Sequence, residues 1–537
     1  TDTFIDLFKN CKSLKEISKA RSGAKTGKNE LFIRCWWEPN FEKVSLNTAS
    51  YDECLDSEYK WYPYNKGGDF CNWYGNNFLV VNFYKGGAEI KEYAEKYHCS
   101  YDLSAKDVYF KEGITWTALT ISKNSFRFSP VGHLFDSNKG PMVFDDGTGI
   151  DYYLLGLFIS PITQYIIGIL NPTMSLQNGD MDKLPIIIDE EKKNEIISMV
   201  KENISLVKRN QEAFETSYDF MVHPFLNYKK TRIRDCYLEW EMEQKEIFAK
   251  TKQNQEAINK KLIDIYGLAD ELVPNVEDNE ISVRLADEER DVKTFILYLV
   301  GCIFGRYALN NKGITYAGGE WKQNKYQDFL PDKDNILLMS DEEYLEEDIV
   351  NKVVGLVKII FGEEYLEENL DYISGKVSDK PISSRERLRL YFIDNFYDEH
   401  CKLFSATGAG KRPIYWLFDS GKQNGFKALI YMHRYNADTI GNLRVDYLHR
   451  MERIYESEIN RMQDTIDNSS NAREVTAATK RKEKLQKQLK ECQEYDEKIG
   501  HLALSRIEID LDDGVKVNYE KVQTANDGKK YQVLAKI

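Results

Sequence analysis

The sequence lacks the motifs of several enzyme classes. It has no CxxC pair, no HExxH motif and no GxSxG turn, and its seven histidines show no metal-ligand spacing. The nine cysteines are odd in number and are scattered over 537 residues. These absences argue against a structural zinc site, a nucleophile elbow and a disulfide framework, and they fit a reducing cytoplasm.

Basic residues are not in excess. The formal net charge is −14, with 30% charged and 42% hydrophobic residues. Bulk charge therefore does not favour a protein that coats nucleic acid, although an acidic body can carry a local basic groove. The 34 tyrosines suit both core packing and interfaces. No signal peptide is visible, and because the first residue is Thr1 rather than Met we expect a piece of a longer protein.

Long uncharged runs are also scarce, and the stretch 152–170 stands out because it carries no charged residue. Its length is near the threshold for a membrane span, but it contains Pro161 and is flanked by Asp151 and Asp180 rather than by Lys and Arg. Its apolar residues recur at helical spacing. We therefore expect a buried helix, with Ser160–Pro161 starting a second turn or short helix, and no membrane partner.

A polar, basic and glycine-rich stretch, 21–29 (RSGAKTGKN), lies near the start of the chain. It does not have the GxxxxGK[ST] order of a phosphate-binding P-loop. Two interpretations stay open. The stretch is either an exposed turn or a loop whose amides and lysines contact DNA phosphates.

Several longer motifs resemble one family, the large adenine-N6 DNA methyltransferases of bacteriophage-exclusion (BREX) defence systems, known as PglX. The motifs alternate short strands with Gly/Asn turns, as a β-rich recognition domain requires. They are the Gly23-x-x-Thr26-Gly27-x-Asn29 run that continues to Glu38, WYPYNKGG at 61–68, EGITW at 112–116, FRFSPVG at 126–132 and the block 411–436. The stretch 152–186 also resembles the end of the target-recognition domain of type I specificity subunits.

The resemblance implies two motifs that this sequence does not contain. One is the glycine-bearing turn that holds S-adenosylmethionine, and the other is an Asn/Asp-Pro-Pro-Tyr/Phe motif that binds a flipped adenine. Asn171-Pro172-Thr173-Met174 lacks the second proline and the aromatic residue, so we interpret it as a helix stop. We expect no cofactor in this chain, S-adenosylmethionine in the parent enzyme, and no methyl transfer by this chain alone.

The leading hypothesis is therefore a DNA-sequence-reading part. The implied partners are double-stranded DNA, the missing methyltransferase domain, other BREX proteins and a phage-encoded inhibitor. Polar side chains in turn-like stretches are the predicted DNA contacts. In the first part of the chain they are Lys25, Thr26, Lys28, Asn29, Lys66, Lys123, Arg127 and Asn178, and in the second part Lys411 and Arg412 are predicted to meet phosphate.

Two alternatives remain. The acidic balance, the tyrosines and the long helices also suit a scaffold that docks other proteins of a defence complex. A type I-like specificity subunit, acting with separate methylating and cutting subunits, is the other. The dependence of binding on salt separates DNA reading from protein docking.

The expected fold class is α+β, with a β-rich recognition domain followed by a mostly helical body and a long helical hairpin. The predicted division is 1–190 (recognition), 191–400 (helical body), 401–447 (mixed), 448–500 (hairpin) and 501–537 (β ending). Helical spacing predicts helices over 195–214, 232–266 and 292–306. The hairpin resembles the spacer helices of type I subunits, or it braces the fold. Residues 507–511 and 515–519 are predicted strands around an Asp513–Gly514 turn.

Overall fold

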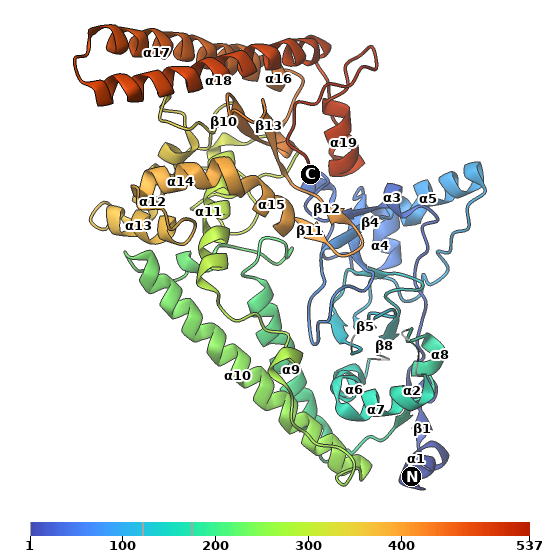
Figure 1. Cartoon of the computed structure of the whole chain (residues 1–537). Helices are drawn as coiled ribbons and strands as arrows, with labels where there is room; N and C mark the ends of the chain where they lie inside the picture. The colour runs from blue at the N-terminus through green and yellow to red at the C-terminus, as the bar shows by residue number, and fades with distance from the viewer. Residues whose placement is uncertain (1, 121–122, 146, 172, 174) are drawn as a thin grey trace. The chain divides into compact units, whose positions relative to one another are not determined.

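The computed structural model describes residues 2–120, 123–145, 147–171, 173 and 175–537 (Figure 1). The chain forms two compact units with interleaved segments. Unit 1 comprises 1–36, 42–221 and 238–287, and unit 2 comprises 37–41, 222–237 and 288–537. The mixed α+β class is confirmed, since both units contain small sheets and long helices. The predicted five-part division stays a prediction.

Unit 1 contains two sheets built from short strands. The four-stranded sheet has the order β2 (Ile33–Cys35), β4 (Leu79–Asn82), β3 (Trp61–Asn65), β7 (Leu134–Phe135), and its β3–β7 pair is parallel. The three-stranded sheet is antiparallel, in the order β6 (Phe126–Ser129), β5 (Gly113–Trp116), β8 (Met142–Phe144). A small pair, β1 (Lys12–Ser13) with β9 (Pro185–Ile186), joins the two ends of this region.

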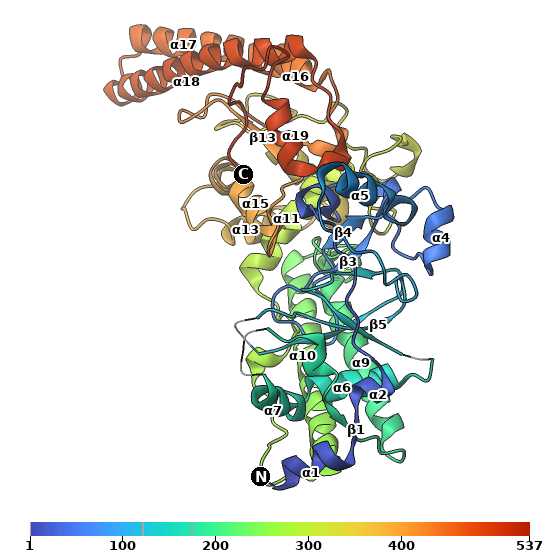
Figure 2. The ribbon, with the colours of Figure 1, turned by 90° about the vertical axis from the view of Figure 1, so that its right-hand side faces the viewer.

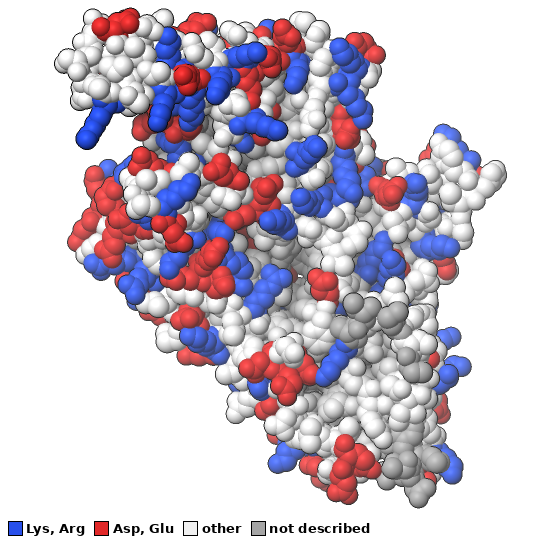
Figure 3. Space-filling view, in the orientation of Figure 1, with Lys and Arg blue, Asp and Glu red and all other residues white. Residues whose placement is uncertain are grey.

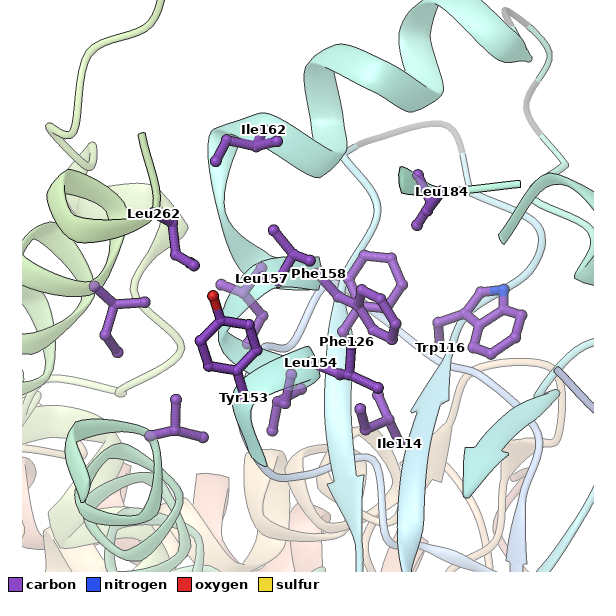
Figure 4. Packing of buried hydrophobic residues seen from close by; sticks show 14 of the residues in the cluster. Ile114, Trp116, Phe126, Tyr153, Leu154, Leu157, Phe158, Ile162, Leu184 and Leu262 are labelled. Atoms are coloured by element: carbon purple, nitrogen blue, oxygen red, sulfur yellow. The ribbon is translucent and has the colours of Figure 1, made fainter. Parts of the chain in front are cut away.

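The uncharged stretch forms two helices, α6 (Ile150–Ile159) and α7 (Pro161–Leu170), bent by 70° at Ser160. Figure 4 shows Leu154 and Phe158 of α6 packing toward Ile114 and Phe126 of the three-stranded sheet, whereas Tyr153 lies on the other side of α6, toward Leu262. The predicted buried helix and the second helix starting at Pro161 are confirmed. No single helix among the described residues is long and apolar enough to cross a membrane; the bent α6–α7 pair meets that criterion only by combined length and composition. Of the predicted helix stop, Pro172 and Met174 lie outside the described residues.

Helices α9 (Lys193–Gln211) and α10 (Ile233–Tyr266) confirm two of the predicted helices. Val200 of α9 is buried in the same apolar cluster as α6. Buried amides also join α9 to α10. Asn210 Nδ2 donates to Gln244 Oε1 at 2.7 Å, and Asn254 Nδ2 donates to Asn203 Oδ1 at 3.0 Å. Paired amides at these positions explain why α10 shows weak apolar periodicity and still packs.

Unit 2 is built around the buried helix α11 (Glu288–Phe304), which confirms the third predicted helix. Its main sheet has the order β10 (Leu337–Leu338), β14 (Lys427–Tyr431), β13 (Tyr415–Asp419). Helices α12 (Ile349–Phe361), α13 (Leu366–Gly375), α14 (Ser384–Tyr391) and α15 (Tyr397–Leu403) follow α11, with a π-helical turn, Phe392–Phe396, between α14 and α15. A two-stranded ribbon pairs β11 (Ser405–Ala406) with β12 (Gly410–Lys411).

The hairpin prediction is confirmed by α17 (His449–Asn468) and α18 (Ala472–Ser505), which run side by side in Figures 1 and 2. Met451 and Tyr455 on one arm and Leu485 and Tyr495 on the other are buried. The remaining short helices are α1 (Asp2–Asn10), α2 (Leu14–Ile17), α3 (Asn29–Phe32), α4 (Tyr51–Asp56), α5 (Tyr84–Tyr97), α8 (Asn178–Met181) and α16 (Thr439–Asn442).

The predicted strands near the C-terminus are wrong. Residues 514–522 form helix α19 (Gly514–Val522), preceded by a short 3₁₀ turn. Val515, Tyr519 and Val522 are buried at helical spacing, whereas Val517 is 52% exposed. A local alternation of apolar and polar residues was mistaken for a strand, since the helical period becomes visible only when Val522 is included.

Candidate nucleic-acid interface

The loop 20–29 is fixed to its neighbours by backbone pairing. Arg21 bridges to Met142, Ala24 to Asp136 and Lys25 to Asp102. Gly23 lies against the backbone of Phe135, where an added Cβ would stand 1.9 Å from the carbonyl oxygen. A glycine is required at this position for close approach of two backbones. The loop is therefore a held segment rather than a free turn.

This loop presents most of its predicted contact residues. Lys25 is exposed and donates from Nζ to Ser100 Oγ at 3.0 Å. Lys28 is exposed and lies 3.4 Å from the Glu30 carboxylate. Thr26 is buried, and its hydroxyl donates to Asn29 Oδ1 at 2.8 Å. Thr26 therefore orients the exposed Asn29 amide, and its own side chain is too buried to contact DNA directly.

Asn178 joins the loop from a distant part of the chain. It starts α8, and its Nδ2 donates to Ser22 Oγ at 3.0 Å across 156 positions of sequence. A second contact next to it, from Ala20 N to Asp182 Oδ1 at 2.9 Å, fixes α8 against the same loop. The structure thus ties Asn178 to the start of the loop at Ser22, and Lys25, Lys28 and Asn29 follow further along the same loop.

Lys66 follows β3 and is half-buried. Its neighbour Tyr64 donates its hydroxyl to Ala24 O at 2.9 Å and to Asp136 Oδ2 at 3.0 Å. The loop 136–140 also contacts the first loop, since Ser137 N donates to Ala24 O at 3.2 Å. The loop 20–29 therefore contacts both helix α8 and the loop 136–140, and the loop 136–140 contacts Gly67. We call helix α8 and the loops 20–29, 66–68 and 136–140 the polar loop cluster.

Sequence analysis missed Lys139, an exposed residue of this cluster. An added Cβ on Gly67 would stand 2.9 Å from Lys139 O, so the two loops touch. The available signal was the polar Asn138-Lys139-Gly140 turn that directly follows the Phe135-Asp136 motif.

The sequence was compared with those of known proteins. No family model matches the chain. The adenine-specific methyltransferase PglX of Lacticaseibacillus casei (strain Zhang) is 35% identical over 521 residues, which cover 95% of this chain and 42% of that protein. The adenine-specific methyltransferase BrxX of Escherichia coli O9:H4 (strain HS) is 31% identical over 551 residues, covering 97% and 44%.

The chain is PglX-like. The family resemblance inferred from the motifs is confirmed, and the identity extends over nearly the whole chain. The chain spans less than half the length of either relative.

Two predicted contacts of this PglX-like chain lie outside the polar loop cluster. Lys123 is 62% exposed and forms an ion pair with Glu280. Arg127 was expected in a turn, and this is wrong: it lies inside β6 and is only 2% exposed. Strand β6 pairs with β5 on one side and bridges to Trp73 on the other, so the side chain faces the interior.

Arg127 is held by neutral groups. Its Nη1 donates to Thr117 Oγ1 at 3.3 Å and to Ser125 Oγ at 3.4 Å, and burial lowers the pKa of the guanidinium. A side chain enclosed in this way serves the packing of unit 1. We leave it out of the proposed DNA footprint.

Lys411 and Arg412 lie in unit 2. Lys411 is exposed at the end of the β11–β12 ribbon. Arg412 is half-buried, and its Nε lies 3.5 Å from Glu38 Oε2. Trp37 Nε1 also donates to Arg412 O at 3.0 Å. Arg412 is therefore engaged within unit 2, and the predicted phosphate contact of this pair stays a prediction. Figure 3 shows basic and acidic side chains interspersed over the face in view, with several basic ones projecting from the hairpin.

Proposed function

We propose that this chain is the DNA-sequence-recognition part of a site-specific adenine-N6 DNA methyltransferase that serves a BREX phage-defence system in the cytoplasm. The observation that carries the proposal is the polar loop cluster of unit 1 on a PglX-like chain. It carries Lys25, Lys28 and Asn29 on one held loop, and it ties Asn178, from a distant part of the sequence, to Ser22 of that loop. In the parent enzyme a separate domain would bind S-adenosylmethionine and transfer the methyl group. Other BREX proteins and a phage-encoded inhibitor are further proposed partners.

The side-chain types of the cluster suit double-stranded DNA. Asparagine amides pair with the N6 and N7 edge of adenine, and each such pair gives about 1–3 kcal/mol of discrimination. Lysines contact phosphates and fix the register of the protein on the duplex. The Thr26 hydroxyl bonded to Asn29 Oδ1 at 2.8 Å orients one candidate base-reading amide before DNA arrives. The whole chain carries a formal net charge of −14, which repels DNA over most of its surface. We therefore expect unit 1 to meet DNA at this local group of cations.

The test is binding of the purified chain to a randomised duplex library, followed by sequencing of the bound fraction. An enriched short motif is expected. Affinity for the enriched duplex is then measured from about 50 to 200 mM salt, where loss of one phosphate contact lowers the log–log slope by about 0.9. The Lys25→Glu/Lys28→Glu variant should bind more weakly and with a slope shallower by about two.

The matched control is Lys245→Glu/Lys250→Glu on α10, which makes the same change in net charge at exposed positions of unit 1. It should leave the slope unchanged. No enriched motif and no salt-dependent binding would contradict the proposal. Salt-insensitive capture of another defence protein would favour the scaffold alternative instead.

A further inference from the structure

Lys66 is a half-buried cation whose amine forms no ion pair in the described part of the chain. Its amine makes no ion pair and no hydrogen bond with any described residue, and burial lowers its pKa. Partly desolvated lysines normally find a carboxylate, because an unpaired charge away from water raises the free energy of the folded state. The position of Lys66 therefore needs an explanation.

The carboxylate of Asp136 acts on Lys66 through its charge, which partly offsets the lowering of the Lys66 pKa by burial, but its hydrogen bonds go to other donors. Its Oδ1 accepts the backbone N–H groups of Asn138 at 2.8 Å and Lys139 at 2.9 Å, and its Oδ2 accepts the Tyr64 hydroxyl at 3.0 Å. These bonds use the carboxylate to shape the loop 136–140. The same loop brings a second cation, Lys139, close enough to lower the pKa of Lys66 further. Two cations therefore lie near each other, and the Asp136 carboxylate hydrogen-bonds the loop 136–140 and Tyr64 rather than either amine.

The backbone beside Lys66 is shaped for close approach. Gly67 and Gly68 have φ values of +80° and +148°, and a Cβ on either would stand 2.9 Å or less from its neighbours. The Thr117 hydroxyl donates to Gly68 O at 3.3 Å and fixes this turn. The atoms that fill this space are Lys139 O beside Gly67 and the Asn76 side chain beside Gly68, so the glycines let the turn pack directly against the loop that carries Lys139.

We propose that Lys66 and Lys139 form a seat for one phosphate group, and that a backbone phosphate of the DNA duplex occupies it. The proposal that the phosphate belongs to a DNA duplex rests on the proposed function. The proposal that the two lysines bind a phosphate oxyanion does not. The half-buried Lys66 defines where the phosphate sits, and the exposed Lys139 adds a second positive charge. Such a contact carries no base preference and sets the register in which Asn29 and Asn178 meet the bases.

The experiment uses the full chain, with Lys66→Gln, Lys139→Gln, the double variant, the charge-preserving Lys66→Arg, and the control Lys111→Gln at an exposed position of unit 1. Duplex affinity is measured against salt for the wild-type chain and each variant. Because both lysines would bind the same phosphate, each single variant and the double variant should all lose about one unit of slope. Two independent contacts would give a loss of about two in the double variant and overturn the shared seat. Lys66→Arg should keep most of the affinity.

A second readout locates the phosphate. Single methylphosphonate substitutions, which remove the charge of one phosphate, are placed along each strand of the duplex. One position should weaken wild-type binding several-fold and leave Lys66→Gln and Lys139→Gln unaffected. A merely structural lysine gives no such position. Duplex binding that responds to neither lysine, with no such position, overturns the seat and leaves the proposed function standing.

The third readout is a thermal shift with inorganic phosphate against chloride at equal ionic strength. Phosphate should raise the melting temperature of the wild-type chain and not that of Lys66→Gln. If this holds while no duplex binds, the seat takes free phosphate and the proposed function fails. If phosphate stabilises both chains equally and duplex binding ignores the lysines, the proposal is wrong.

Discussion

The carbonyl oxygen of Phe135 occupies the space that a side chain on Gly23 would need, with a distance of 1.9 Å to an added Cβ. This contact lets the loop 20–29 lie flat against β7, where Ala24 N donates to the same Phe135 carbonyl at 2.7 Å. The glycine is therefore what fixes the polar loop cluster in unit 1, rather than a source of flexibility.

Gly23→Ala should lower the thermal stability of unit 1 by about 2–4 kcal/mol, since backbone atoms cannot move aside as a flexible side chain can. It should also speed hydrogen exchange of the peptide that contains 20–29. The matched control is Gly168→Ala in α7, where nothing lies within 4 Å of an added Cβ. Replacing a helical glycine there should stabilise by roughly 0.5–1 kcal/mol. Equal effects of the two substitutions would remove the steric argument.

How far the sequence predicts this fold depends on how local each signal is. The split of the uncharged stretch at Ser160–Pro161 follows from a proline at the first turn of a helix, and both helices appear where the pattern places them. The C-terminal helix α19 was missed because the Asp513–Gly514 pair matches a hairpin turn and only the burial of Val522 reveals the helical period.

The candidate site is less predictable, because exposure is a tertiary property. Lys25 and Arg127 were both predicted to contact DNA, yet Lys25 is exposed and Arg127 is enclosed by β5 and Trp73. The polar turn at Lys139 is a weak signal, and the bond of its backbone to Asp136 and the contact of its carbonyl with Gly67 are what place it near Lys66. The exposure of these residues depends on which distant loops and strands pair, and a short stretch of sequence does not carry that information.

Arg127→Ala tests whether this arginine is structural. Its removal leaves a cavity and loosens the hydroxyls of Thr117 and Ser125, so we expect a loss of about 2–4 kcal/mol in the stability of unit 1. The affinity for duplex DNA, corrected for the folded fraction, should not change. A fall in affinity and salt slope at unchanged melting temperature would return Arg127 to the DNA footprint.

Leu485→Ala addresses the hairpin of α17 and α18. Leu485 is fully buried in the seam, so truncation should cost about 2–5 kcal/mol and raise hydrogen exchange in both arms. Leu504 lies on the same helix and is 84% exposed, so Leu504→Ala should change stability by less than about 0.5 kcal/mol. If DNA affinity falls with Leu485→Ala while unit 1 keeps its melting temperature, the spacer role gains support over a bracing role. If the two leucines behave alike, the seam is not what holds the arms together.

Asp151 gives a prediction in pH. This carboxyl is 1% exposed at the start of α6, and burial, with Asp145 and Glu112 nearby, raises its pKa to about 6. The folded state therefore binds the proton more tightly than the unfolded state, in which a carboxyl of this type titrates near 3.9. The stability from this group is fully present below about pH 4 and is lost as the pH rises through 6.

Asp151→Asn removes that penalty, because the amide stays neutral at every pH in this range. The variant should melt at a higher temperature than the wild-type chain at pH 7.5, by the equivalent of about 1–3 kcal/mol, and the difference should shrink toward pH 4.5. Differential scanning calorimetry across this range measures it. Glu190→Gln, at a position where the carboxylate is 78% exposed, serves as the control and should show no such trend. A gain that is larger at pH 4.5 than at pH 7.5 would mean that the Asp151 carboxylate is stabilised in the fold, and that its partners rather than its burial decide its charge.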